Sequence, residues 1–296
     1  MRRFLTLCVL ALVLLPFSAF ASVLCVPSDQ GVLVGNDLTV IHPNIDNGTH
    51  VYVGTFNVTV DCVTATQVYC TDVGVNLCLG TQYMQAPNIE DPRIVWILNN
   101  YYPAVPGMPS ELSTDAERKA AVQLAIWHFS DGCDITQNGT GGSASAAVFD
   151  AARAIIAVAQ GATVPPTPTT MELSPAYSEP ALGSTVIVTA TVKDENGVVM
   201  ANVPVSWTAT DAHPTSGSGV TDSKGQITAS WVWEGYGWAT FNVVYTIPIG
   251  LSWKLPGCQD LIQGQTVTGR LTAVWGDENS VGTTPATWGS IKSLYE

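Results

Sequence analysis

One short segment, residues 114–132, predicts a helix that must be buried on nearly every side. Thr114 and Glu117 have the spacing of a capping box at its start, and Gly132 provides a stop signal. Between these signals most positions are apolar, namely Ala116, Ala120, Val122, Leu124, Ala125, Ile126, Trp127 and Phe129. A helix without a polar face lies inside a domain. The fold must therefore cover this helix with other elements.

Gln123 lies in the middle of this apolar helix and is expected to be buried together with its side-chain amide. A buried amide is costly unless it is hydrogen-bonded or chemically altered. The simplest interpretation is a core glutamine whose amide is paired, because most buried polar groups are paired. The helix by itself does not decide between a paired amide and an altered one.

The first 21 residues have the pattern of a secretory signal peptide. Two arginines precede an apolar run that reaches Leu15, and a small-residue site would allow cleavage after Ala21. No later run of the sequence is long and apolar enough to cross a bilayer. We therefore expect a secreted or extracellular protein, either free or associated with the cell surface, with no membrane insertion after signal removal.

The charge of the chain narrows the possible partners. Without residues 1–21 the chain keeps 9 basic against 24 acidic residues. This balance disfavours nucleic acids and anionic membranes as partners, because both require cationic patches. Charged residues make up only 12 % of the sequence, about half the usual share. Low charge together with abundant Thr, Val and Gly is typical of extracellular β-rich modules.

Six cysteines remain after the predicted cleavage: Cys25, Cys62, Cys70, Cys78, Cys133 and Cys258. In an exported protein the default expectation is disulfides, whose pairing the sequence does not give. Zinc is a weaker interpretation, because the spacings do not fit a zinc knuckle and no histidine cluster joins the cysteines. We expect neither a metal nor a cofactor.

Residues 22–162 predict an α+β domain, with strands followed by helices. The segments 54–62 and 67–72 have strand patterns separated by a short polar turn. From Arg93 the pattern becomes helical, with a short helix ended by Pro103, the helix of Gln123, and a third helix over residues 143–160.

The Pro/Thr-rich stretch 163–170 predicts a stiff linker and a domain boundary. Beyond it, short alternating strands separated by polar turns over residues 171–276 predict an all-β sandwich. Residues 265–275 are the candidate for its last strand. The tail, residues 277–296, is polar and rich in Gly, Thr and Ser, and it yields no prediction.

Two motifs resemble the paired signatures of the thioester domains of bacterial surface proteins. Y-C-T-D, residues 69–72, matches an aromatic-Cys-x-Asp segment, and V-Q-L-A-I-W, residues 122–127, matches an apolar-Gln-x-apolar-apolar-aromatic segment. Between them, R-I-V-W-I-L-N-N-Y-Y-P, residues 93–103, resembles the helix ending in Tyr-Pro that such domains carry. The order and spacing of the three segments make the resemblance fairly specific.

The second domain resembles bacterial immunoglobulin-like modules of the invasin and intimin kind. The matching segments are T-V-K-D-E-N-G-V-V-M-A-N-V-P-V-S-W, residues 191–207, and the turn T-D-S-K-G-Q, residues 221–226. The resemblance implies a stalk, since such modules usually act as stalks in surface proteins.

The first resemblance implies an internal thioester between Cys70 and Gln123. In the family, the thiolate attacks the glutamine carbonyl, ammonia leaves, and the thioester later acylates an amine such as a partner's lysine. The protein would then be an adhesin-like, single-turnover covalent binder and not an enzyme. Trp127, one turn after Gln123, is expected to shield the thioester from water together with Tyr69. Asp72 is a candidate helper or orienter, and a turn role for it is equally compatible with the sequence.

Alternatives stay open at this level. Cys70 in a disulfide would give a non-covalent binding or structural surface protein, and cysteine parity favours it because a thioester leaves five cysteines. A cysteine hydrolase pairing Cys70 with His50 or His128 has no local oxyanion-hole pattern to support it. Gln82 and Gln85 are rival acyl donors, but no apolar helix surrounds them.

Overall fold

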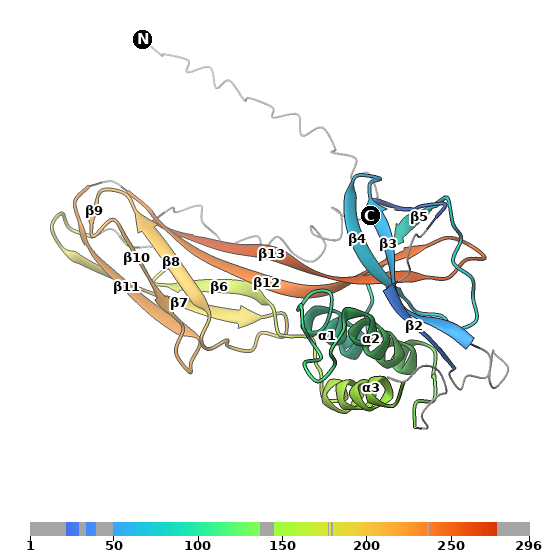
Figure 1. Ribbon diagram of the computed structural model, residues 1–296. Coiled ribbons are helices and arrows are strands. Elements are labelled where there is room, and N and C mark those ends of the chain that lie inside the picture. Colours follow the sequence, from blue (N-terminus) through green and yellow to red (C-terminus); the bar gives the residue numbers. More distant parts are fainter. Residues whose placement is uncertain are drawn as a thin grey trace, which may run out of the picture.

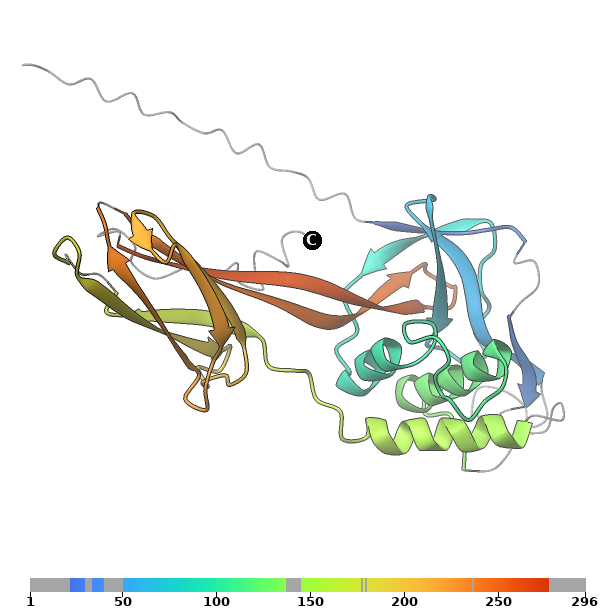
Figure 2. The ribbon, with the colours of Figure 1, turned by 60° about the vertical axis from the view of Figure 1, so that its left-hand side comes forward.

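The structure is a computed structural model that describes residues 22–29, 34–39, 50–136, 145–176, 178, 180–235 and 237–276. The described chain is elongated, with a core at each end and one long β-hairpin joining them (Figure 1, Figure 2). The predicted signal peptide and the polar tail lie outside the described residues. In the described part, none of the helices has the length and apolar character needed to span a bilayer.

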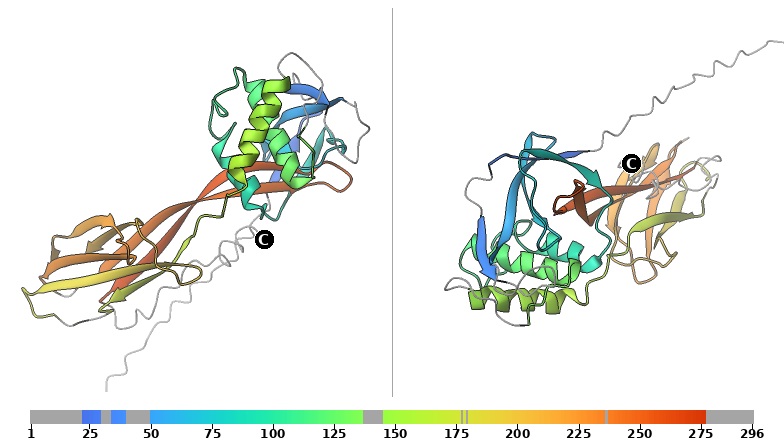
Figure 3. Two further views of the ribbon diagram at one scale, coloured as in Figure 1. Left: turned by 90° about the horizontal axis from the view of Figure 1, so that it is seen from below. Right: turned by 90° about the vertical axis from the view of Figure 1, so that its right-hand side faces the viewer.

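The first core combines a sheet with three helices. Its elements in chain order are β1 (Val23–Val26), β2 (Val34–Thr39), β3 (His50–Val60), β4 (Thr64–Cys70), β5 (Thr81–Ala86), α1 (Pro92–Asn100), α2 (Asp115–Ser130) and α3 (Ser145–Ala159). The helices lie together on one side of the strands (Figure 3). Strands followed by helices is the α+β order that the sequence predicts, and this part of the prediction is confirmed.

α2 is the buried helix expected from the sequence. The Oγ1 atom of Thr114 accepts the N–H of Glu117, and the Glu117 carboxylate accepts the N–H of Thr114, which completes the capping box. Every residue from Lys119 to Trp127 is buried, because α1, α3, β2 and β3 pack around the helix. Gln123 has no exposed surface.

The second core is a β-sandwich. Its strands are β6 (Pro168–Ser174), β7 (Thr185–Asp194), β8 (Pro204–Ala209), β9 (Ala212–His213), β10 (Ser216–Val220), β11 (Gln226–Trp233) and parts of β12 (Ala239–Lys254) and β13 (Leu261–Trp275). The sheet β6-β7-β11-β9 packs on strands β10, β8, β12 and β13. Trp231 fills the space between the sheets and packs on Trp207, Phe241 and Trp275. The predicted all-β sandwich is confirmed.

The hairpin of β12 and β13 belongs to both cores. At one end β12 pairs with β8, and at the other end β12 pairs with β5 while β13 pairs with β4. In the first core the pairing β12-β13-β4-β3-β1-β5 returns to β12, so these strands form a closed ring. Closure leaves no free sheet edge at this position.

The sequence predicts a domain boundary at residues 163–170, with all later strands in the sandwich. The hairpin of β12 and β13 does not follow this division. Buried side chains near its turn, including Ile249, Trp253 and Leu261, belong to the first core and not to the sandwich. The alternating pattern predicts a strand but does not say which core the strand enters. The linker is also shorter than expected, because β6 begins at Pro168 and pairs there with Asp194.

Two disulfides tie the first core together. Cys25 pairs with Cys62, and Cys78, in the segment after β4, pairs with Cys258 in the turn of the hairpin. The second bridge joins positions 180 residues apart in the sequence, so it fixes the hairpin turn to the first core. Cys70 and Cys133 are buried and take part in neither disulfide. If Cys70 forms a thioester, five cysteines remain, and Cys133 is the one among them that takes part in neither disulfide.

Candidate functional site

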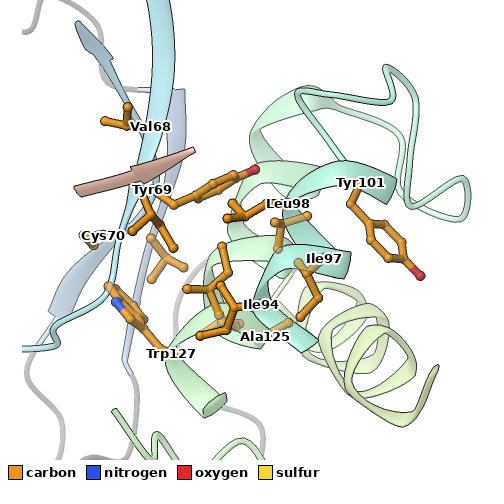
Figure 4. Packing of buried hydrophobic residues seen from close by; sticks show 14 of the residues in the cluster. Val68, Tyr69, Cys70, Ile94, Ile97, Leu98, Tyr101, Ala125 and Trp127 are labelled. Atoms are coloured by element: carbon orange, nitrogen blue, oxygen red, sulfur yellow. The ribbon is translucent and has the colours of Figure 1, made fainter. Parts of the chain in front are cut away.

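Cys70 and Gln123 lie in contact in the first core, between the end of β4 and the middle of α2. Cys70 is 1 % exposed and Gln123 is 0 % exposed. The Sγ atom of Cys70 is 3.4 Å from Oε1 of Gln123. Figure 4 shows Cys70 at the end of its strand with Trp127 of α2 beside it. The structure thus brings together the two residues named from the sequence.

The amide of Gln123 is held by the backbone of Cys70. The N–H of Cys70 donates to Oε1 over 3.1 Å, and Nε2 of Gln123 donates to the Cys70 carbonyl over 2.8 Å. Both ends of the amide are therefore fixed to one residue. This pairing leaves the amide no freedom to rotate away from the Cys70 sulfur.

The Gln123 amide fills the position where a strand neighbour of Cys70 is missing. β3 pairs with β4 only as far as Val68, while β13 continues on the other side and places Leu261 opposite Cys70. The N–H of Thr71 donates to the Asp260 carbonyl over 3.1 Å. The backbone N–H and C=O groups of successive strand residues point to alternate sides. Because those of Thr71 point toward β13, the N–H and C=O of Cys70 point toward the side where β3 no longer pairs. The amide satisfies them there, where they would otherwise be buried and unpaired.

This geometry suits attack of sulfur on the Gln123 carbonyl. A sulfur 3.4 Å from the carbonyl oxygen is within reach of the carbon bonded to it. Attack moves negative charge onto Oε1, and the N–H of Cys70 already donates to that atom. A preorganised donor at the atom where charge develops is the usual device for stabilising such an intermediate.

The surroundings of Cys70 favour the protonated thiol. Burial raises the pKa of the Cys70 thiol well above its ordinary value, the indole N–H of Trp127 opposes this rise, and the carboxylates of Asp72 and Asp131 add to it. The Trp127 contact is weak, since Nε1 has no partner of good hydrogen-bond geometry among the described residues. At neutral pH the thiol therefore retains a proton that it can give to a leaving nitrogen.

Trp127 and Tyr69 occupy different sides of the strand that ends at Cys70. Trp127 is 2 % exposed and follows Gln123 by one helical turn. Tyr69 is the strand neighbour of Cys70, so its side chain points to the opposite face. Its ring is directed toward α1 (Figure 4), and its hydroxyl donates to the Tyr102 carbonyl over 2.7 Å. Of the two aromatic residues, Trp127 is the one beside the sulfur.

Asp72 contacts the hairpin turn. In a continued strand Asp72 would lie on the same face as Cys70. β4 ends at Cys70, so Asp72 does not share a strand face with it. Its carboxylate accepts the N–H of Asp260 over 3.0 Å, and its carbonyl accepts Nε2 of Gln259 over 2.8 Å. Asp72 thereby holds the start of β13 in place opposite Cys70, which is an orienting position.

Two further contacts join the end of α2 to the segment after Cys70. The Ser130 hydroxyl donates to the Thr71 carbonyl over 2.7 Å, and the Asp131 carboxylate accepts the N–H of Val73 over 2.7 Å. Ser130 is the last residue of α2 and Asp131 is its C-cap, and the end of a helix in the sequence carries no information on what its side chains bind. These contacts fix α2 and β4 relative to each other on either side of the Cys70–Gln123 pair.

The rival residues lie in other contacts. The Nδ1 atom of His128 is 3.2 Å from the carbonyl oxygen of Cys133, and its ring packs on Phe129. Nε2 of Gln82 faces the sulfur of Cys62 near the surface. The side chain of His50 lies outside the described residues. Among the residues that the structure describes, no cluster of His, Cys, Asp and Glu could hold a metal ion.

Two protein-family models match parts of this chain. Residues 67–161 match the family model of the thioester domain, and residues 182–243 match that of the bacterial Ig-like domain (group 1). Both match the resemblances found in the sequence. Among curated protein sequences, none matches this chain.

Solved structures of thioester proteins are similar to this chain, and two of them share its fold over most of its length. The thioester domain of the Enterococcus faecium TIE86 protein has 13 % sequence identity and a TM-score of 0.54, with 86 % of this chain and 96 % of that chain covered. The Bacillus anthracis TIE protein has 12 % identity and a TM-score of 0.51, with 86 % and 48 % covered. At such identities the likeness shows the fold, and its coverage extends over both cores. The two family models, over residues 67–161 and 182–243, identify a thioester domain followed by a bacterial immunoglobulin-like domain.

Proposed function

We propose that this protein is an adhesin-like molecule that attaches covalently to an amine through an internal thioester between Cys70 and Gln123. The observation that carries this proposal is the double hydrogen bond between the Gln123 amide and the Cys70 backbone, with the Cys70 sulfur beside the same amide. A buried thiol and a buried amide are thereby held in contact and cannot drift apart. The match of the chain to the thioester-domain family supports the same chemistry.

Formation of the thioester is an acyl transfer from nitrogen to sulfur. The bond from Sγ of Cys70 to Cδ of Gln123 forms, the bond from Cδ to Nε2 breaks, and the thiol proton passes to the departing ammonia. Fixed contact between two reacting groups contributes on the order of 7–11 kcal/mol to such a step. The Cys70 N–H stabilises the charge on Oε1, so the residues at the site supply all the groups that this step uses.

Reaction with a partner's amine transfers the Gln123 acyl group from sulfur back to nitrogen. The nitrogen of an amine attacks Cδ of Gln123, the bond to sulfur breaks, and a proton from the amine passes to the Cys70 thiolate. An amide to the partner and a free thiol remain, so each molecule reacts once and does not turn over as an enzyme would. The dry surroundings of Gln123 and Trp127 slow hydrolysis before the amine arrives.

The proposal places the protein outside the cell. The predicted signal peptide supports export, and two disulfides are typical of an oxidising compartment. The immunoglobulin-like sandwich would present the thioester domain at a distance from its attachment point. A partner that offers a lysine brings positive charge, and the excess of 24 acidic over 9 basic residues in the exported chain attracts it.

A non-covalent surface protein is the second candidate. One observation favours it: the amide of Gln123 is fully hydrogen-bonded as it stands, as a core glutamine would be. In that case Cys70 is a buried thiol without chemistry. The sequence analysis based this alternative on a disulfide of Cys70, but Cys70 takes part in neither disulfide. The candidate therefore rests on the paired amide alone.

Intact mass separates the two candidates. The mature protein, Cys70→Ala, Gln123→Ala and Cys133→Ala are measured before and after methylamine, with remaining thiols alkylated. We expect the wild type and Cys133→Ala to be lighter by one ammonia and to add methylamine. Neither property should survive in Cys70→Ala or Gln123→Ala. An unmodified wild-type mass with an alkylated Cys70 and no adduct would refute the covalent proposal.

A further inference from the structure

Lys119 is a buried lysine on the same helix as Gln123. It precedes Gln123 by four residues, so both side chains lie on one face of α2. Lys119 is only 2 % exposed, and buried lysines are usually paired with a carboxylate. Among the described residues no carboxylate forms an ion pair with it, because Asp115, one turn earlier, binds Arg118 instead. The amine therefore lacks the partner that usually holds a buried lysine.

An aromatic ring holds the Lys119 ammonium. Its Nζ lies 5.0 Å from the centroid of the Tyr102 ring, which is a cation–π contact. The backbone carbonyl of the same Tyr102 accepts the hydroxyl of Tyr69, the residue next to Cys70. The turn after α1 therefore contacts both the lysine and the strand of the thiol.

Lys119 also loses its proton more easily than an exposed lysine. Burial lowers the pKa of the Lys119 amine, and the negative charge of Asp115 only partly opposes this. A neutral amine is the form that attacks a thioester. The buried position of Lys119 thus favours the reactive form of a nucleophile one helical turn from Gln123.

We propose that Lys119 is an internal acceptor for the Gln123 acyl group, and that the Tyr102 ring holds it away from the thioester. This rests on the proposed function, because only a thioester makes the Gln123 carbonyl reactive enough. Residues four apart on a helix have Cβ atoms about 5–6 Å apart, a distance that a lysine side chain spans. Release of Lys119 from the ring is the movement that the reaction requires.

The reaction balances without a co-reactant. Nζ of Lys119 attacks Cδ of Gln123, the bond from Cδ to Sγ of Cys70 breaks, and a proton from Nζ passes to the thiolate. The products are an isopeptide bond between Lys119 and Gln123 and a free Cys70 thiol. A molecule that reacts in this way can no longer bind a partner, so Tyr102 determines how long the thioester stays available.

Four variants test this inference: Tyr102→Leu, Tyr102→Phe, Lys119→Arg and the double variant Tyr102→Leu/Lys119→Arg. Phe keeps the ring, and Arg keeps the cation but offers no nucleophilic amine. Each is followed after purification by intact mass, methylamine addition, alkylation of Cys70 and trypsin cleavage after residue 119.

We expect Tyr102→Leu to lose methylamine addition at least tenfold faster than the wild type. Its mass should stay one ammonia light, Cys70 should become alkylatable, and trypsin should no longer cleave after Lys119. Tyr102→Phe should behave like the wild type, and the double variant should keep its methylamine reactivity. Equal stability of Tyr102→Leu and the wild type would overturn the inference. The inference would also be overturned if Tyr102→Leu lost methylamine addition while its mass rose by one water, and the double variant lost it equally fast.

A second measurement covers the case in which Tyr102→Leu does not fold. The wild type and Lys119→Arg are incubated at about pH 9, where more of Lys119 is neutral; the groups that face it are Asp115 and Tyr102. We expect only the wild type to lose methylamine reactivity at constant mass, and equal decay would contradict the inference. Absence of the ammonia loss in both freshly purified proteins would instead refute the thioester itself.

Discussion

Leu261 lies directly opposite Cys70 in the antiparallel register of β13 and β4. A residue from the hairpin that the two cores share therefore forms part of the wall of the thiol site. Leu261 has no exposed surface, and it belongs to the same core as Gln123's helix. The hairpin that carries it is fixed by the Cys78–Cys258 disulfide and by the contact between Asp72 and Asp260. Thioester chemistry at Cys70 should therefore depend on a strand far away in the sequence.

Leu261→Ala tests this dependence. Truncation of a buried leucine costs about 2–5 kcal/mol of unfolding free energy, and here it also opens space beside Cys70. We expect a smaller fraction of molecules lighter by one ammonia and faster hydrolysis, both read by intact mass. Leu271→Ala is the matched control, because Leu271 is buried on the same strand but in the second core. An equal effect of both variants on the thioester would show that the position opposite Cys70 has no special role.

The thioester domain should not fold when the chain ends before the sandwich. A chain of residues 22–162 lacks the buried hairpin residues Ile247, Ile249, Leu251, Trp253, Leu261 and Ile262. It also leaves β4 and β5 as open edges. We expect no cooperative thermal unfolding and no loss of ammonia in this short chain. A chain of residues 22–276 should show cooperative unfolding and should lose one ammonia.

A rescue separates the hairpin from the rest of the sandwich. Residues 246–264 joined to the short chain by a flexible Gly/Ser linker should restore cooperative unfolding and the ammonia loss. The rescue rests on the ring β12-β13-β4-β3-β1-β5, which needs only this part of the hairpin. Cooperative folding of residues 22–162 alone would contradict the prediction.

Local signals predicted the part of the site that lies on α2. The capping box, the apolar positions and the burial of Gln123 follow from patterns within one helix, and the structure confirms them. The partnership of Cys70 with Gln123 came from the family resemblance. No pattern in the sequence says that the amide would take the place of a missing β3 neighbour.

The hairpin could not be predicted from the sequence for a physical reason. Alternation along 239–275 predicts strands, but both cores accept the same alternation. Which core a strand enters depends on long-range pairing, here of Leu261 with Cys70 and of Trp253 with Gln85. The role of Asp72 was open for a similar reason, since its partner Asp260 lies on that hairpin.

Trp127→Phe should slow thioester formation. The indole N–H of Trp127 lowers the pKa of the Cys70 thiol against the effect of burial, and Phe cannot provide it. Each unit by which the thiol pKa rises reduces the thiolate population by a factor of about ten. Intact mass at fixed times after refolding gives the rate. Trp253→Phe is the control, because Trp253 is buried in the same core but is not among the groups that shift the pKa of the Cys70 thiol. Equal slowing in both would assign the effect to packing.

The raised pKa of Cys70 predicts a pH dependence of stability in Gln123→Ala, which cannot form the thioester. The unfolded thiol ionises near its ordinary pKa of 9.0, and burial raises the pKa in the folded chain. Below about pH 9 the thiol is protonated in both states, so its contribution to stability is complete. Above that pH only the unfolded chain ionises, and the free energy of unfolding falls by about 1.4 kcal/mol per pH unit.

Urea unfolding between about pH 8.5 and about pH 10.5 measures this contribution when Gln123→Ala is compared with Cys70→Ala/Gln123→Ala. Other groups cancel in the difference, including Cys133, whose thiol pKa is raised to about 12 by burial. We expect the stability of the single variant to fall relative to the double variant as the pH rises. A difference that does not change with pH would mean that Cys70 ionises as easily in the folded chain as in the unfolded one. The thiol would then be accessible to water, and the site would lack the dryness that a long-lived thioester needs.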